Sequence, residues 1–172
     1  MEFIQEIKVP AERIAVLIGK KGSTKRKLCK ELNIRIIIDT EEQLVTLKGE
    51  DNLNLLVGKQ VVQAIARGFN PEVALSLLDD ENSCEIIDIT DFSGNSKQKL
   101  FRLRARVIGR EGKARENIEQ LTHTHISIFG KTVTIIGNLD DVLKAKHAIE
   151  TLLRGSKHAT VYSWLEKQEK SL

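Results

Sequence analysis

The first half of the chain switches between strand-like and helix-like spacing of its apolar residues. Phe3, Ile7 and Val9 fall on one face of an extended segment, which predicts a strand. The predicted elements are a strand at residues 2–9, helices at 10–18 and 23–32, strands at 35–39 and 44–48, and a helix at 52–67. The inward stripe of the last helix is expected to comprise Leu53, Leu56, Val57, Val61, Ala64 and Ile65.

The second half repeats this order, which indicates two tandem domains. The run VLIGKKGSTKRKL at residues 16–28 matches ARVIGREGKAREN at residues 105–117, and the two GxxG turns lie 90 positions apart. We therefore expect an α+β protein in which each domain is a three-stranded antiparallel sheet packed by three helices. The second set of elements is a strand at residues 84–91, helices at 96–107 and 113–121, strands at 125–129 and 132–136, and a helix at 139–153. The expected boundaries are 1–69 and 84–155 for the domains, 70–83 for a connecting helix or linker, and 156–172 for a helical tail.

Positive charge is concentrated around the two turns. Residues 19–30 carry six basic residues and no acid, residues 97–115 carry eight basic residues and one acid, and the whole chain has a net charge of only +3. The remaining 141 residues therefore sum to −10. Basic surface confined in this way favours a polyanionic partner, although a single basic run is equally typical of a solvated helix face.

Other classes of function find little support in the sequence. No apolar run approaches the ~20 residues of a membrane span, and the N-terminus lacks the pattern of a signal peptide. Cys29 and Cys84 are expected to be reduced thiols, which points to a cytoplasmic protein. The run from Gly130 to Thr132 resembles the end of a phosphate-binding P-loop, but the required glycine is replaced by His125. We expect no enzyme activity, metal or cofactor.

The two GxxG turns carry the candidate chemistry. Glycine lets the backbone approach a sugar-phosphate chain without a Cβ in the way, and the following helix points free N–H groups at a phosphate. Ser23 is expected to cap the helix after the first turn. IGKKG at residues 18–22 and IGREG at residues 108–112 resemble the signature of the KH RNA-binding domain. The resemblance covers nearly the whole chain and implies the type I KH fold, with a clamp on about four nucleotides of single-stranded RNA.

The RNA-binding residues expected on this basis lie in the two turns, the adjoining helices and the strand at 125–129. They are Ile18, Gly19, Lys20, Lys21, Gly22, Lys25, Arg26, Arg104, Arg106, Ile108, Gly109, Arg110, Glu111, Gly112, Lys113, Arg115, Ile126, Ser127 and Ile128. We expect both turns to bind RNA, and the second to be tighter because its surroundings carry more basic residues. The alternative is that one copy serves only the structure.

A narrower resemblance comes from the second half. The element GS-x-H-x-x-VY-x-x-LE at residues 155–166 is similar to the archaeal relatives of the Pno/Dim-two (partner of Nob) proteins, which act in small-subunit assembly. This resemblance implies binding near the 3′ end of small-subunit rRNA. It also implies three protein partners: the alpha subunit of translation initiation factor two, the maturation endonuclease and the dimethyladenosine transferase. The GKKG turn at residues 19–22 fits the archaeal branch, because eukaryotic members lack this turn in their first domain.

A second function stays open beside RNA binding. The chain could be a scaffold whose KH folds mainly hold ribosome-assembly or translation-initiation proteins. The acidic stretch at residues 72–91 and the tail motivate this alternative, and Val161, Trp164 and Leu165 are the candidate partner-binding residues.

Overall fold

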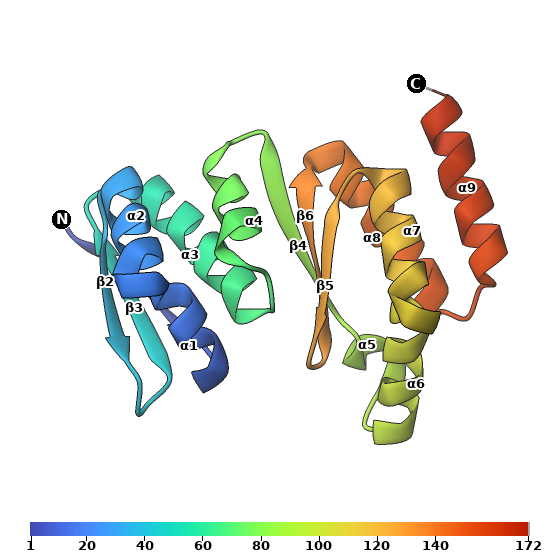
Figure 1. The fold of residues 1–172 in the computed structure, drawn as a ribbon, viewed down its shortest axis with the longest axis horizontal. Coiled ribbons are helices and arrows are strands. Elements are labelled where there is room, and N and C mark those ends of the chain that lie inside the picture. Colours follow the sequence, from blue (N-terminus) through green and yellow to red (C-terminus); the bar gives the residue numbers. More distant parts are fainter. Residues whose placement is uncertain (172) are drawn as a thin grey trace. The chain divides into compact units, whose positions relative to one another are not determined.

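The computed structural model describes residues 1–171, and Leu172, the last residue of the expected tail, lies outside the described part. The described chain forms two compact units that divide between Asp80 and Glu81, each with its own three-stranded antiparallel sheet. In each unit helices pack against one face of the sheet (Figure 1). The predicted α+β class with two antiparallel three-stranded sheets is confirmed.

The first unit places its third strand in the centre of the sheet. Its elements are β1 (Phe3–Lys8), α1 (Ala11–Ile18), a 3-10 turn η1 (Lys20–Gly22), α2 (Ser23–Leu32), β2 (Arg35–Asp39), β3 (Leu44–Gly49), α3 (Asn52–Ala66), α4 (Pro71–Leu75) and a 3-10 turn η2 (Ser76–Leu78). The sheet order is β1-β3-β2, with Ile7 opposite Val45 and Ile36 opposite Leu47. The central strand buries Val45 and Leu47 against the helices, and β1 and β2 form the two edges.

The inward face of α3 differs from the prediction. Leu53 and Leu56 are 74% and 43% exposed, whereas Leu55 is fully buried. The side chain of Asp51 caps this helix by accepting hydrogen bonds from Leu53 N at 2.9 Å and Asn54 N at 3.3 Å. The residues after this cap are apolar on nearly every side, so periodicity alone assigned the wrong leucines to the core.

The second unit follows the same plan, with a short helix after its first strand and a further helix at its end. Its elements are β4 (Asn82–Asp88), α5 (Thr90–Ser93), α6 (Lys97–Ile108), a 3-10 turn η3 (Arg110–Gly112), α7 (Lys113–Thr122), β5 (His125–Phe129), β6 (Thr132–Asn138), α8 (Leu139–Leu153) and α9 (His158–Lys170). The sheet order is β4-β6-β5. The predicted strand at 84–91 is too long at its end, because Asp88 accepts hydrogen bonds from Thr90 N and Oγ1 at 2.9 and 2.6 Å and turns the chain into α5.

Helix α9 packs against α7 and α8 of its own unit. Val161 and Leu165 are 2% and 1% exposed and belong to the core of this unit, so their expected role as partner-binding residues has to be corrected. Trp164 is half-buried, and its ring centroid lies 4.5 Å from that of His147 on α8. The apolar spacing of these three residues therefore reflects packing of the tail helix onto its own domain.

The two cysteines are free thiols in unlike surroundings. Burial on β4, with a smaller contribution from the adjacent Glu85, raises the pKa of Cys84 from 9.0 to about 12. We expect Cys84 to resist alkylation by iodoacetamide at pH 8 and to react faster as the pH approaches 12, because only the thiolate is nucleophilic. Mass spectrometry of the folded protein would measure this, with the urea-unfolded protein as control. Equal rates in both states at pH 8 would contradict it.

Candidate nucleic-acid interface

The two GxxG turns share one backbone conformation. Gly19 and Gly109 have φ of 76° with ψ of 175° and 176°, and Gly22 and Gly112 are left-handed with φ of 75° and 76°. The residue before the second glycine is left-handed in both turns, since Lys21 and Glu111 both have φ of 55°. Opposite charges therefore occupy the same place on the same backbone, and the shape of the turn does not depend on them.

The two glycines of each turn are required for different reasons. A Cβ on Gly19 would lie 2.4 Å from Thr24 Oγ1, and one on Gly109 would lie 2.5 Å from the Ala114 Cβ. In contrast, a Cβ on Gly112 would come no closer than 3.9 Å to the Arg115 guanidinium. The first glycine thus packs directly on the following helix. The second provides a left-handed turn, with open space beside Gly112, whereas a Cβ on Gly22 would lie 3.2 Å from Arg26 Nη1.

Each turn ends at the start of a ten-residue helix without a side-chain cap. The N-cap residues of α2 and α7 are Gly22 and Gly112, and neither cap has a side-chain hydrogen bond. The expectation that Ser23 caps α2 is therefore wrong, because Ser23 is already the first residue of the helix. Helix N-termini of this kind present N–H donors and a positive dipole end, which suit an anion.

A groove of about 680 Å³ lies beside the first turn. It brings together four predicted residues, and its walls are Ile18, Gly22, Lys25, Arg26, Cys29 and Lys30. Cys29 and Lys30 were missed by the sequence analysis, although their spacing of three to four residues from Lys25 and Arg26 on one helix could have revealed them. Arg26 Nη1 donates to Lys21 O at 2.5 Å and so braces the turn, while Lys20 and Lys21 are exposed to solvent.

The second turn presents Arg110 and Lys113 to solvent, as well as the acidic Glu111. Arg115 points instead to Glu119 of α7, with Arg115 Nη1 donating to Glu119 Oε1 at 2.5 Å. The acid Glu119 was missed, although the i,i+4 spacing from Arg115 predicts such a pair. The second turn thus differs from the first in carrying acids among its cations.

The predicted residues of β5 and the end of α6 are less exposed. Ile126 is 4% exposed and lies in the core, so its side chain faces the interior of the protein. Ile108 is half-buried beside the turn, and Ser127 and Ile128 are half-buried on β5.

Two arginines of α6 face the protein. Arg106 Nε donates to Leu152 O at 3.2 Å, and its Nη2 donates to Ser156 O. Arg104 is half-buried, and its Nε is buried with no hydrogen-bond partner in the described structure. Because these two arginines face the protein, they give less support to the expectation that the second turn binds RNA more tightly than the first.

Arg13 plays the same part in the first unit as Arg106 in the second. Its Nε donates to Ile65 O at 2.7 Å and its Nη2 donates to Phe69 O at 2.6 Å, at the end of α3. In both units an arginine of the helix before the turn therefore satisfies carbonyls at the end of the last sheet-packing helix.

We expect Arg106→Lys to lower the free energy of unfolding by about 1.5–3 kcal/mol, because an ammonium group cannot bridge two carbonyls as the planar guanidinium does. Affinity for RNA should stay the same, since the charge is kept. Urea denaturation measures the first effect, with Arg102→Lys at an exposed position of α6 as the matched control. Weaker RNA binding by Arg106→Lys at unchanged stability would instead assign Arg106 to the interface.

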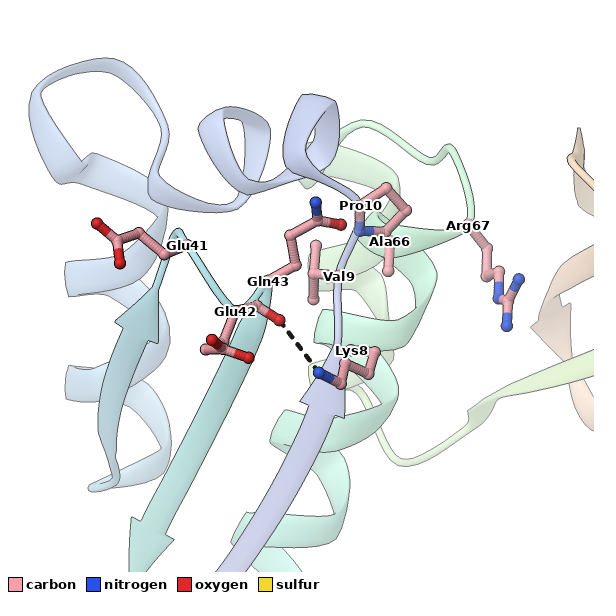
Figure 2. A pocket seen from close by; sticks show the side chains of 8 residues that line it. All are labelled: Lys8, Val9, Pro10, Glu41, Glu42, Gln43, Ala66 and Arg67. Atoms are coloured by element: carbon pink, nitrogen blue, oxygen red, sulfur yellow. Dashed lines mark hydrogen bonds between the residues drawn. The ribbon is translucent and has the colours of Figure 1, made fainter.

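A separate hollow of about 400 Å³ lies in the first unit, between the end of β1, the turn that joins β2 to β3, and the end of α3 (Figure 2). It is lined by Lys8, Val9, Pro10, Glu41, Glu42, Gln43, Ala66 and Arg67, so it contains no residue of the GxxG turn. Lys8 Nζ donates to Glu42 O at 3.1 Å, which closes one side of the hollow. Its two acids make it a poorer place for a polyanion than the groove beside the turn.

Residues 1–171 lack the features of two other classes of site. No cluster of three or more His, Cys, Asp or Glu residues within that range could hold a metal ion. Within the same range, no helix combines the length and the apolar character that crossing a bilayer requires.

Comparisons with known proteins agree with the geometry of the turns. Residues 4–64 match the KH domain profile, and residues 83–170 match a profile described as a eukaryotic type KH-domain (KH-domain type I). The KH domain-containing protein MJ0443 of Methanocaldococcus jannaschii is 44% identical over 98% of this chain and 75% of its own length. The RNA-binding protein pno1 of Dictyostelium discoideum is 30% identical over 95% of this chain and 71% of its own length.

A solved structure resembles the whole chain. It is a chain from the crystal structure of the a/eIF2alpha-aDim2p-rRNA complex of Pyrococcus horikoshii, with a TM-score of 0.91 and 43% identity, covering 99% of this chain and 96% of that one. A crystal structure of Dim2p from the same organism gives a TM-score of 0.87 at 43% identity, covering 96% of this chain and 99% of that one. The sequence, the duplicated turns and these relatives agree, and the chain belongs to the Pno1/Dim2 family of KH-domain proteins.

Proposed function

We propose that this chain is a non-catalytic, single-stranded RNA-binding protein that acts in maturation of small-subunit rRNA by holding the rRNA near its 3′ end. The observation that carries the proposal is the duplicated turn, in which bare glycine backbone and an uncapped helix N-terminus stand beside exposed lysines and arginines. The names of the relatives support it, since they include an RNA-binding protein pno1 and pre-rRNA-processing proteins pno1.

The turn and the groove would divide the work of binding. A phosphate would lie against the turn, where Lys20 and Lys21 of the first unit or Arg110 and Lys113 of the second add positive charge. The neighbouring bases would enter the groove, whose aliphatic wall at Ile18 needs no stacking aromatic residue. KH domains clamp about four nucleotides in this manner. We propose each unit as a module of type I, with strands and helices in the order strand, helix, helix, strand, strand, helix.

Protein partners follow from the same assignment. The Pyrococcus relative was crystallised with a/eIF2alpha and rRNA, which supports the initiation-factor subunit as a partner of this chain. The maturation endonuclease and the dimethyladenosine transferase are proposed with it as fellow assembly factors. A cytoplasmic location and the absence of any catalytic role are part of the same proposal.

Fluorescence anisotropy with a labelled 3′-terminal fragment of small-subunit rRNA tests the function. We expect log affinity to fall with log salt at a slope of about −3 for each unit engaged, because single strands give about −0.7 for each phosphate neutralised and a KH domain clamps about four nucleotides. The same fragment annealed to its complement serves as control and should bind more weakly. A slope near zero, or equal binding of the duplex, would reject the clamp.

A scaffold role is the second candidate, favoured by one observation. Leu139 and Leu143 lie four residues apart on α8 and are 53% and 47% exposed, which leaves an apolar strip on the second unit. A complex with the purified initiation-factor subunit that survives ribonuclease and is lost in Leu143→Glu would support protein docking on α8. Loss of the complex on ribonuclease treatment would assign it to RNA.

A further inference from the structure

The repeat places different residues at equivalent positions of the two units. Cys29 lines the groove of the first unit, and the residue 90 positions later, at the offset that separates the turns, is Glu119. Lys25, another wall residue, corresponds in the same way to Arg115. The second unit therefore has a carboxylate at the position where the groove of the first unit has a thiol.

The carboxylate of Glu119 is held at both oxygens. Arg115 Nη1 donates to Oε1 at 2.5 Å, and Ile126 N donates to Oε2 at 2.9 Å. Ile126 belongs to β5, an edge strand in the order β4-β6-β5, so its amide reaches α7 across the open edge of the sheet. The side chain of Glu119 keeps 19% of its surface exposed, and that of Arg115 keeps 33%.

This arrangement can recognise a nucleotide base through hydrogen bonds. A carboxylate has about four lone-pair sites and no donor, and two of those sites on Glu119 are used by the protein. The remaining sites can accept from the exocyclic amino group of cytosine or adenine, whereas the O4 atom of uracil is itself an acceptor and is repelled. Because both oxygens are already fixed, little side-chain freedom would be lost on binding.

We propose that Glu119 of α7 is the specificity-determining residue of the second unit and selects a base with an exocyclic amino group over uracil. The proposal rests on the proposed RNA-binding function and extends it. Arg115 is a positioning residue that orients the carboxylate. The first groove, with Cys29 in place of the acid and cations at Lys25 and Lys30, binds by charge and tolerates any base.

The test uses the full chain with the first turn silenced by Lys20→Asp and Lys21→Asp. Labelled eight-nucleotide oligo-C, oligo-A and oligo-U are titrated at one salt concentration. We expect oligo-C and oligo-A to bind about tenfold more tightly than oligo-U, the discrimination expected from a good base contact. Glu119→Gln should bring the three affinities within about twofold, because the amide presents a donor as well as an acceptor.

Two further measurements distinguish a loss of base selectivity from a loss of the folded structure. Glu119→Gln keeps an oxygen for Ile126 N, and thermal unfolding reports whether the unit remains folded. The reciprocal variant Cys29→Glu, in a chain silenced at the second turn by Arg110→Asp and Lys113→Asp, should create a preference for oligo-C over oligo-U in the first groove.

The outcomes distinguish base selection by Glu119 from the proposed RNA-binding function of the whole chain. An unchanged ratio of oligo-C to oligo-U affinity in Glu119→Gln, or equal binding of the three oligonucleotides by the parent, overturns the base-reading role and leaves RNA binding intact. If Glu119→Gln unfolds, the Cys29→Glu result decides, and no gain of preference there overturns the role. Failure of the unmutated chain to bind any oligonucleotide or rRNA fragment overturns the proposed function itself.

Discussion

Replacing Gly109 by alanine will destabilise the second unit by about 3 kcal/mol or more. The new Cβ would lie 2.5 Å from the Ala114 Cβ and 2.6 Å from Ala114 N, and this helical backbone has little freedom to move aside. The φ and ψ of 76° and 176° also lie in a region open essentially to glycine alone, where other residues cost about 1–3 kcal/mol. The steric clash and the strained backbone act together.

The second glycine of the same turn provides the matched control. Gly112 has an ordinary left-handed conformation and open space at its Cβ, so Gly112→Asn should cost about 1 kcal/mol or less. Urea denaturation followed by circular dichroism compares the two variants. Equal loss of stability in Gly109→Ala and Gly112→Asn would show that the contact with Ala114 does not constrain the turn.

Charge reversal at both turns should abolish RNA binding while the protein stays folded. We expect the triple variant Lys20→Asp, Lys21→Asp, Arg110→Asp to bind the rRNA fragment at least about 100-fold more weakly, because attraction to phosphate dominates affinity. All three side chains are exposed, and aspartate tolerates the left-handed conformation found at Lys21. The free energy of unfolding should change by less than about 0.5 kcal/mol for each substitution.

A control for net charge is available on α9. The double variant Lys167→Asp, Lys170→Asp changes the charge by the same amount per residue. Both positions lie near Glu169, whose Oε1 is 3.2 Å from His123 Nε2. His123 follows the last residue of α7, at the end of that helix remote from the turn. This variant should lose only a few-fold in affinity through long-range attraction. A comparable loss in both variants would mean that net charge, and not the turns, governs binding.

The repeat, the sheets and the turns could be predicted from the sequence because each has a local signature. Glycine spacing marks the turns at residues 19–22 and 109–112, and alternation or helical spacing marks the elements around them. The duplication strengthens each of these predictions, because the same spacing of glycines and apolar residues occurs twice in the chain.

The features that could not be predicted depend on contacts between distant residues. Arg106 reaches Leu152 O, 46 residues away, and nothing in the basic run of α6 separates it from the exposed Arg102. The role of Glu119 depends on Ile126 N at the edge of β5. A pattern of charges gives the number of cations near a turn, but only the fold shows which of them face outward.

The shared backbone of the two turns has a consequence for how such a protein changes over time. Lys21 and Glu111 occupy equivalent places with the same φ of 55°, so a change in a single codon can reverse the charge at this place while the backbone of the turn remains undisturbed. After duplication, one copy of the turn can therefore evolve toward weaker and more selective binding, while the other copy keeps strong and unselective binding. The glycines preserve the architecture, and the residue directly before the second glycine is left open to selection.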